Sequence, residues 1–207
     1  MEPSPSSTSD LALVAVFAGV ISAATLAPAI PVGSVGVPIT LQTLAVALTA
    51  MVLGPWRGFT ATALYVVVGL AGLPVFAGGA SGPGVLAKPS AGYLLAFPLA
   101  ALLVGHLARS VLKGAGGRTG MRWFLLFVSG LVGSFVFIHP LGIAGIAVNA
   151  GIPVEKAVLA DLVYWPGDVV KNAVASFVAL AVHRAFPGLL VHPAVERDLA
   201  RKPDRVG

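Results

Sequence analysis

Residues 123–148 read WFLLFVSGLVGSFVFIHPLGIAGIAV, an apolar run that contains no Asp, Glu, Lys or Arg. A helix that crosses the hydrocarbon core of a membrane needs about 20 residues of this kind, because each residue advances the helix by about 1.5 Å. The run is therefore predicted to be a membrane-spanning helix.

Five further apolar runs accompany this one. In chain order, the six runs are residues 11–27, 37–53, 58–73, 92–107, 123–148 and 166–186. Six spans use about 120 residues, which leaves enough of the 207-residue chain for loops and tails. We therefore expect an all-α integral membrane protein, a bundle of six transmembrane helices.

The two ends of the chain are polar, in contrast to the segment between them. We expect a polar N-terminal tail (1–10), one six-helix membrane domain (11–187) and a charged C-terminal tail (188–207). No Lys or Arg precedes the first apolar run, and the run is long for a signal-peptide core. We interpret it as a retained helix.

The composition excludes an ordinary soluble domain. Hydrophobic residues make up 57% of the chain and charged residues 10%, against about 25% charged in soluble domains. The net charge of +5 does not indicate nucleic-acid binding, because no exposed polar segment carries the basic residues as one face. The absence of cysteine excludes disulfides and thiolate chemistry.

The basic residues are concentrated in alternate loops. Most of the 13 Lys and Arg fall in the turn at 54–57, the loop at 108–122 and the C-terminal end, whereas the opposite loops hold only Lys88 and Lys156. Basic loops remain in the cytoplasm. Both termini are therefore predicted to be cytoplasmic.

The loops on the opposite, outer side are apolar and rich in Gly and Pro. Residues 28–40 read PAIPVGSVGVPIT, and residues 73–90 read LPVFAGGASGPGVLAKPS. Irregular backbone near the membrane needs a protein cover or a cavity, because its peptide groups must find partners. The two loops predict a ligand pocket on the outer side, and two exposed flexible loops are the alternative.

The stretch YWPGDVVKN, residues 164–172, places two charges inside the last apolar run. Asp168, Lys171 and Asn172 are three and four residues apart, so they share one face of a helix. Charged residues inside a membrane usually face a cavity or one another. The three side chains are candidates for binding a polar ligand with donors and acceptors, and an internal ion pair that fixes packing is the alternative.

Other residues are weaker candidates for the same pocket. Lys88 lies in the outer loop, where it can receive a carboxylate or remain solvated. Gln42 and Thr43 are polar groups among apolar neighbours that can bind a ligand or another helix. The aromatic residues near outer helix ends form either an interfacial belt or pocket walls, and they are Phe76, Tyr93, Tyr164 and Trp165.

Small residues recur every four positions in the first run. Ala15, Gly19 and Ala23 form a groove that permits close approach of another helix, in this bundle or from a partner. His139, which precedes Pro140, is assigned no role.

Catalytic and metal motifs do not fit. The run GGASGPG (78–84) resembles a nucleophile elbow only loosely, since proline stands where glycine is needed. P-loop and HExxH patterns are absent from the sequence. We therefore expect neither an enzyme nor a bound cofactor or metal.

Four segments together resemble one family. The segments are VPITLQTLAV (37–46), GLAGLPVFAGG (69–79), KPSAGYLLAF (88–97) and WPGDVVKN (165–172). They resemble the BioY family, the biotin-specific substrate-binding S-components of energy-coupling factor (ECF) transporters. The resemblance runs from the first apolar run to the sixth.

The resemblance implies a specific fold and function. It implies the six-helix S-component fold, with biotin held near the outer side and Asp168 and Lys171 contacting its head group. It also implies a prokaryotic cell-membrane protein that works with a transmembrane coupling subunit and two cytoplasmic ATPase subunits, which hydrolyse the ATP. The groove at Ala15, Gly19 and Ala23 is then the docking surface for a partner helix.

Three other functions stay open on the sequence. One is a stand-alone or ion-coupled biotin carrier that uses Asp168 as its titrating group. Another is an intramembrane enzyme that uses Asp168, His139 or Ser81. The third is a structural scaffold in which Asp168 and Lys171 serve packing.

Overall fold

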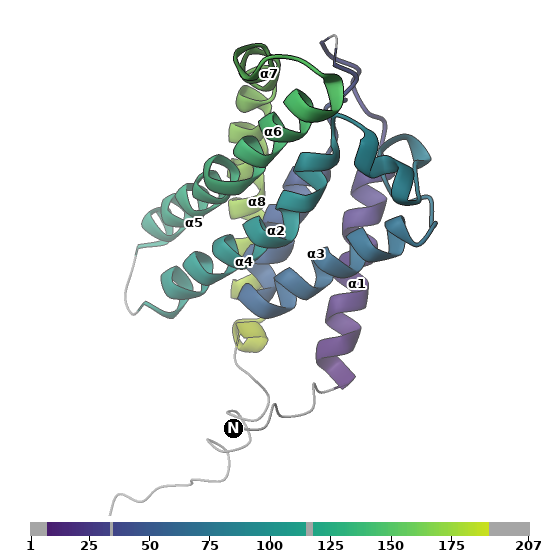
Figure 1. Ribbon diagram of the computed structural model, residues 1–207. Helices are drawn as coiled ribbons and strands as arrows, with labels where there is room; N and C mark the ends of the chain where they lie inside the picture. Colours follow the sequence, from purple (N-terminus) through teal and green to yellow (C-terminus); the bar gives the residue numbers. More distant parts are fainter. Residues whose placement is uncertain (1–7, 34, 115–117, 191–207) are drawn as a thin grey trace, which may run out of the picture.

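The computed structural model describes residues 8–33, 35–114 and 118–190, and these residues form a bundle of helices (Figure 1). Within this part of the chain the backbone forms no named β-strand, only two isolated bridges. The helices are α1 (Thr8–Leu26), α2 (Gln42–Leu53), α3 (Pro55–Leu70), α4 (Ala91–Lys113), α5 (Thr119–Gly133), α6 (His139–Ala150), α7 (Val154–Asp161) and α8 (Trp165–Ala185). The predicted all-α class is confirmed.

Each predicted apolar run corresponds to a helix, with shifted ends. A π-helix (Ser134–Ile138) joins α5 to α6, so that one continuous helix covers Thr119–Ala150. The second run begins as a helix at Gln42 instead of residue 37, because Pro38 holds the preceding residue in extended backbone. The short helix α7 was not predicted.

Three helices are long and apolar enough to cross a membrane. They are Thr8–Leu26, Ala91–Lys113 and Thr119–Ala150. The helix α2 has 12 residues, fewer than the roughly 20 that a straight span needs.

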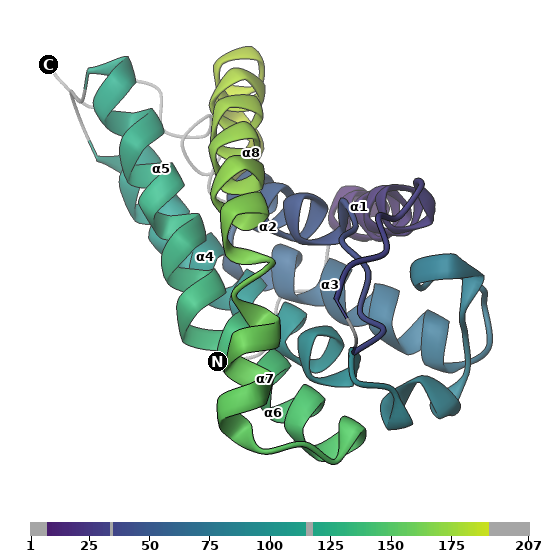
Figure 2. The same cartoon turned by 90° about the horizontal axis from the view of Figure 1, so that it is seen from above.

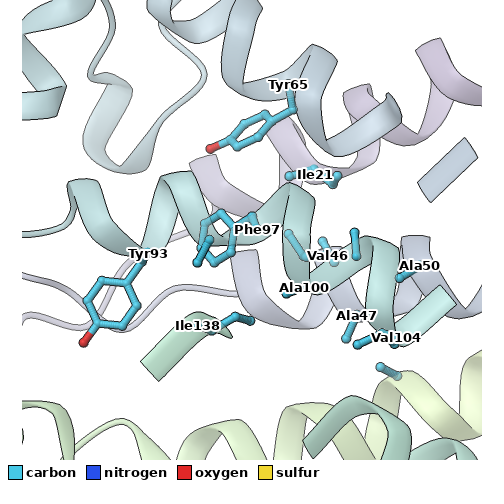
Figure 3. Packing of buried hydrophobic residues seen from close by; sticks show 14 of the residues in the cluster. Ile21, Val46, Ala47, Ala50, Tyr65, Tyr93, Phe97, Ala100, Val104 and Ile138 are labelled. Atoms are coloured by element: carbon cyan, nitrogen blue, oxygen red, sulfur yellow. The ribbon is translucent and has the colours of Figure 1, made fainter. Parts of the chain in front are cut away.

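The centre of the bundle is the contact between α2 and α4. Their facing residues are small or aliphatic and nearly inaccessible to solvent (Figure 3). The labelled residues of this contact are Val46, Ala47 and Ala50 on α2 and Phe97, Ala100 and Val104 on α4. Close packing of this kind holds membrane helices together without a hydrophobic driving force.

Glycines allow α4 to approach two neighbouring segments closely. A Cβ on Gly92 would overlap the carbonyl oxygen of Leu141 in α6, and a Cβ on Gly105 would overlap the backbone at Gly54. No larger residue fits at either crossing without backbone movement. These contacts fix how α4 sits between α6 and the turn that joins α2 to α3.

The two ends of the bundle differ (Figure 1). One end carries α7 and the loops 27–41 and 71–90, and we refer to it as the loop end. The opposite end, here the basic end, carries the start of α1, the end of α8 and the connection between α4 and α5. At the basic end Arg57 pairs with Asp10 at 2.7 Å and donates to the carbonyl of Leu189 at 2.8 Å.

Candidate functional site

A cavity of about 90 Å³ lies at the loop end, under the two Gly- and Pro-rich loops. Its walls come from both loops and from α2, α4 and α8. The lining residues are Val37, Pro38, Ile39, Thr40, Gln42, Thr43, Phe76, Ala77, Val85, Ser90, Tyr93, Leu94, Phe97, Tyr164, Asp168 and Lys171. The predicted pocket between the outer loops therefore exists as a cavity.

One side of the cavity carries a buried ion pair. Lys171 Nζ lies 3.1 Å from Asp168 Oδ1, and the two side chains are only 13% and 6% exposed. Thr43 Oγ1 donates to the same carboxylate oxygen at 2.9 Å and accepts from Lys171 Nζ at 3.1 Å. The first two turns of α8, which begins at Trp165 with a proline at its second position, present this pair to α2.

The second oxygen of Asp168 has a different neighbour. It lies 3.6 Å from His139 Nε2, which is beyond hydrogen-bonding distance. No described residue donates a hydrogen bond to this Oδ2, so it is able to accept from a molecule in the cavity. The cavity therefore offers a carboxylate acceptor, an ammonium donor and a hydroxyl within a few ångströms of one another.

A second buried carboxylate lies behind the first. Asp161 is fully buried and accepts hydrogen bonds from Tyr93 Oη at 2.5 Å and from Trp165 Nε1 at 2.7 Å. His139 Nδ1 lies 3.0 Å from Asp161 Oδ2, within hydrogen-bonding distance. His139 thus stands between Asp161 and Asp168.

Aromatic side chains enclose His139. The rings of Phe135 and Trp165 pack around the imidazole, with centroids 4.9 and 5.6 Å from it.

A helix irregularity brings His139 to this position. Pro140 has no backbone N–H and its ring crowds the carbonyl four residues earlier, so a regular helix cannot continue through it. The π-helix Ser134–Ile138 directly precedes His139. The extra residue per turn rotates the following helix and lets the His139 side chain reach α7 and α8.

The predicted site residues divide into two groups. Six of them line the cavity, namely Gln42, Phe76, Tyr93, Tyr164, Asp168 and Lys171. Asn172 lies behind it, where its Nδ2 donates to the Asp168 carbonyl at 2.9 Å and to Ser134 Oγ at 3.2 Å. Lys88 is exposed and outside the lining, and its carbonyl accepts from Asn149 Nδ2 at 2.8 Å.

The sequence analysis did not identify Asp161 as a site residue and assigned no role to His139. The two lie 22 residues apart and meet only through the folding of α6 against α7. Residues on separate helices have no characteristic spacing in the sequence, so no local pattern could have identified this pair.

The loops over the cavity are tied to the helices. Tyr164 Oη donates to the carbonyl of Val37 at 2.7 Å, and Ile30 and Ile39 exchange two backbone hydrogen bonds of 2.9 Å. Phe76 packs edge-on against Tyr65, with ring centroids 5.4 Å apart. The loops therefore form an apolar cover over the polar wall.

The aromatic residues form the walls of the cavity. Tyr93 and Tyr164 contact each other edge-to-face with centroids 5.9 Å apart, and Phe97 is buried deeper on α4 (Figure 3). Apolar walls with a few convergent polar groups are typical of small-molecule sites. The arrangement suits a small ligand that has an apolar ring body and a polar edge with donors and an acceptor.

Comparison with known proteins identifies relatives of this chain. The family model described as "BioY family" matches residues 1–188. The biotin transporter BioY of Rhizobium etli is 35% identical over 87% of this chain and 96% of its own length. The biotin transporter BioY of Rhodobacter capsulatus is 36% identical over 88% of this chain and 97% of its own, and the probable biotin transporter BioY of Bacillus subtilis is 34% identical over 85% and 91%.

A solved structure has the same fold. The crystal structure of the S-component for biotin from an ECF-type ABC transporter superposes with a TM-score of 0.76. The superposition covers 89% of this chain and 95% of that chain, at 22% sequence identity. With the family match over nearly the whole helical region, these findings show that the chain belongs to the BioY family.

Proposed function

We propose that this protein is the substrate-binding S-component of an ECF-type transporter and takes up biotin across the cell membrane of a prokaryote. The observation that supports this most is the buried group of Asp168, Thr43 and Lys171 on the wall of a cavity. Two charges inside an apolar bundle are costly, by about 2.5 to 3.5 kcal/mol each on insertion scales. A site with this cost is explained by a ligand that needs both charges.

The chemistry of biotin matches the cavity. Its ureido ring offers two N–H donors and one carbonyl acceptor, and its bicycle is apolar. Asp168 Oδ2 accepts from a ureido N–H, while Lys171 Nζ donates to the ureido carbonyl. Asn172 is the alternative donor, but its Nδ2 is already bonded to Asp168 O and Ser134 Oγ. Tyr93 and Tyr164 cover the bicycle.

The carboxylate of biotin is expected to extend toward the loops. Lys88 or a backbone N–H of the 71–90 loop is proposed to meet it there. Lys88 lies on the exposed surface at the loop end, where a flexible, carboxylate-ended chain would emerge from the cavity.

The cavity is too small for a whole ligand without movement of its cover. Its volume is about 90 Å³, whereas small-molecule sites occupy about 300 to 1,000 Å³. The Tyr164 to Val37 hydrogen bond and the apolar contacts of Phe76 are the contacts that must open. We propose that the loops 27–41 and 71–90 move apart to admit biotin.

The proposal includes a multi-pass topology with six spans and with both termini in the cytoplasm. The basic end then faces the cytoplasm, in agreement with the positive-inside rule. The shorter α2 and α3 complete the proposed set of spans. Most residues of α2 are buried in the bundle, whereas α3 exposes Trp56 and Val67 on its outer face. Biotin enters from the loop end.

Energy for uptake is proposed to come from partners. These are a transmembrane coupling subunit and two cytoplasmic ATPase subunits. Ala15, Gly19 and Ala23 of α1 are exposed, and a Cβ on Gly19 would meet nothing within 4 Å. The face of α1 that packs inside the bundle is a different one, formed by Val14, Ala18, Ile21 and Thr25. The small-residue face is therefore free to receive a partner helix.

The experiment that tests the proposal is isothermal titration of the purified protein with four vitamins or analogues. We expect tight binding of biotin, weaker binding of dethiobiotin, and none of thiamine or riboflavin. Replacement of Asp168 by Asn or of Lys171 by Ala should weaken biotin binding. Binding of riboflavin or thiamine in place of biotin would contradict the proposal.

A second candidate function is an ion-coupled biotin carrier. It is favoured by His139, which lies between two buried carboxylates, because chains of Asp, Glu and His carry protons in transporters. Uptake of biotin into liposomes that contain only this chain and a pH gradient would support the carrier. Uptake that requires the ATPase subunits and ATP supports the S-component.

A further inference from the structure

A second cavity lies at the basic end of the bundle, remote from the proposed biotin site. It has a volume of about 230 Å³ and lies between the end of α4, the start of α5 and the end of α8. Its lining includes four side chains that carry or can carry positive charge, and these are Lys113, Arg122, His183 and Arg184. Nothing in the proposed biotin site uses this cavity.

The cations of this cavity are not neutralised by the described part of the chain. Arg122 donates to the carbonyl of Gly114 at 3.0 Å, and Arg184 donates to Thr119 Oγ1 at 2.5 Å, so both use neutral acceptors. The described carboxylates are Asp10, Glu155, Asp161 and Asp168, and none of them lines the cavity. A guanidinium has five donors, so both arginines retain donors for an anion.

One polar atom points to an absent partner. Arg122 Nε is shielded from solvent and has no hydrogen-bond partner among the described residues. A buried donor without an acceptor costs about 1 to 3 kcal/mol. A rotation of the Arg122 side chain would let it donate to an anionic oxygen in the cavity.

An apolar groove continues from this cavity along the outside of the bundle. The groove has a volume of about 290 Å³ and shares Thr119, Leu180 and Arg184 with the cavity. Its walls are the aromatic residues Trp123 and Phe177, and Phe177 is 68% exposed. In Figure 2, α5 and α8, which carry these residues, lie on one side of the bundle, and α1 and α3 lie on the other.

We infer that this cavity and groove together bind one anionic phospholipid. The phosphate lies among Arg122, Arg184 and Lys113, and an acyl chain lies in the groove over Trp123 and Phe177. Basic pockets between helices on the cytoplasmic side bind anionic lipid head groups. A free phosphate-type anion would use the cavity but would leave the groove without an occupant. The inference rests on the proposed membrane location, and it does not depend on biotin as the substrate.

Native mass spectrometry of the purified full chain tests this inference. The probes are dioleoyl phosphatidylglycerol, dioleoyl phosphatidylcholine and glycerol phosphate, each offered at the same concentration. We expect the phosphatidylglycerol adduct to survive at higher collision energy than the phosphatidylcholine adduct. Glycerol phosphate alone should not remain bound, because it lacks the acyl chains.

Variants test the contributions of the cavity and of the groove to lipid binding separately. Arg184→Gln should lower phosphatidylglycerol occupancy about fivefold and leave phosphatidylcholine unchanged, whereas the control Lys156→Gln on α7 at the loop end should change neither. Ala181→Phe fills the groove and should lower occupancy by both lipids, whereas Ala144→Phe on α6 should not. If the thermal midpoint shows that Arg184→Gln is unstable, Arg184→Lys serves as the second variant. It keeps the positive charge and should retain phosphatidylglycerol.

Three results would overturn the inference. Equal retention of the two lipids would show that the cations do not select an anion. An Arg184→Gln variant that behaves as Lys156→Gln does would place the lipid elsewhere. Glycerol phosphate that displaces phosphatidylglycerol at equal concentration would assign the cavity to a soluble anion. Biotin binding is measured in a separate titration. Failure of the lipid proposal can therefore be distinguished from failure of the proposed biotin function.

Discussion

The two carboxylate oxygens of Asp168 have different roles, one in the structure and one in ligand binding. Oδ1 is held by Lys171 and Thr43, at 3.1 and 2.9 Å. Oδ2 has only His139 nearby, at 3.6 Å. A carboxylate that served packing alone would have both oxygens bonded to the protein, because a buried acceptor without a donor is costly. The free oxygen beside the cavity indicates a binding role.

Asp168→Asn removes the charge and keeps the shape of the side chain. A hydrogen bond to a charged group contributes about 1.5 to 3 kcal/mol, so biotin affinity should fall by roughly 10- to 100-fold. Isothermal titration measures the change, with Glu155→Gln on the exposed surface of α7 as the control. Equal affinities for the two variants would show that Asp168 does not contact biotin.

Lys88→Ala tests the proposed contact with the carboxylate of biotin. If Lys88 makes this contact, the variant binds biotin more weakly, by up to about fivefold for one exposed charge pair. Its affinity for an uncharged biotin amide should equal that of the wild type. If Lys88→Ala binds both biotin and the amide as tightly as the wild type does, the biotin carboxylate contacts the loop backbone and not Lys88.

His139→Ala should destabilise the protein and weaken biotin binding together. Removing the imidazole takes away a hydrogen-bonding partner of the buried Asp161 carboxylate, and a buried polar group that loses its partner costs about 1 to 3 kcal/mol. His139→Gln retains an N–H donor toward Asp161 and should recover part of the binding. Thermal midpoints and titrations with biotin measure both effects. A His139→Ala variant with the biotin affinity of the wild type would exclude a positioning role for the imidazole.

Residue patterns predicted one half of this polar cluster. Asp168 and Lys171 lie three residues apart on one helix, so their proximity follows from local geometry. His139 and Asp161 come from separate helices, and local spacing carries no information on such a contact. The cavity position of Gln42 and Tyr93 likewise needed the fold, since each fits a helix contact or an aromatic belt equally well.

At the scale of helices, the crossing of α4 and α6 depends on glycine. Gly92 and Gly145 meet there, and Tyr93, which follows Gly92, needs Gly142 on α6 because a Cβ at Gly142 would overlap its ring. The same crossing carries His139 at the start of α6. The helix contact and the polar site are therefore built by the same short segments.

Gly92→Leu should separate α4 from α6. The added side chain has no room beside the Leu141 carbonyl, and overpacking costs at least about 1 to 3 kcal/mol. We expect a lower thermal midpoint and loss of biotin binding, measured by size-exclusion thermostability and titration. Gly120→Ala, where a Cβ meets nothing within 4 Å, is the control and should be neutral or slightly stabilising. A Gly92→Leu variant as stable as Gly120→Ala would contradict the close crossing.

The helices were predictable as apolar runs, but two features were not. The π-helix Ser134–Ile138 lies inside one uninterrupted apolar run, and Pro140 alone does not specify whether a helix kinks, ends or gains a residue. The helix α7 was missed because residues 154–161 are polar enough to be taken as loop. Its eight residues position Asp161 under Tyr93 and Trp165.

At the scale of the whole molecule, the exposed face of α1 is the proposed contact with the coupling subunit. Gly19→Leu or Ala23→Leu should abolish co-purification with that subunit and ATP-dependent uptake, because the side chains block close helix approach. Biotin binding by the isolated chain should be unchanged, since neither residue lines the cavity. Ala144→Leu on α6 is the matched control. Loss of binding together with uptake would instead indicate misfolding.

The all-α class and the place of the pocket were readable from sequence because both follow from composition. Apolar runs predicted the helices, and apolar loops rich in Gly and Pro predicted the cavity. The size of the cavity could not be predicted from the sequence. It depends on the contact of Val37 with Tyr164 and on the packing of Phe76 against Tyr65.

A structure of the purified protein with biotin bound tests the central claim most directly. We expect the ureido ring within hydrogen-bonding distance of Asp168 and Lys171, with the loops 27–41 and 71–90 moved outward. A structure in which biotin lies elsewhere, while Asp168 and Lys171 contact only each other, Thr43 and His139, would contradict the account.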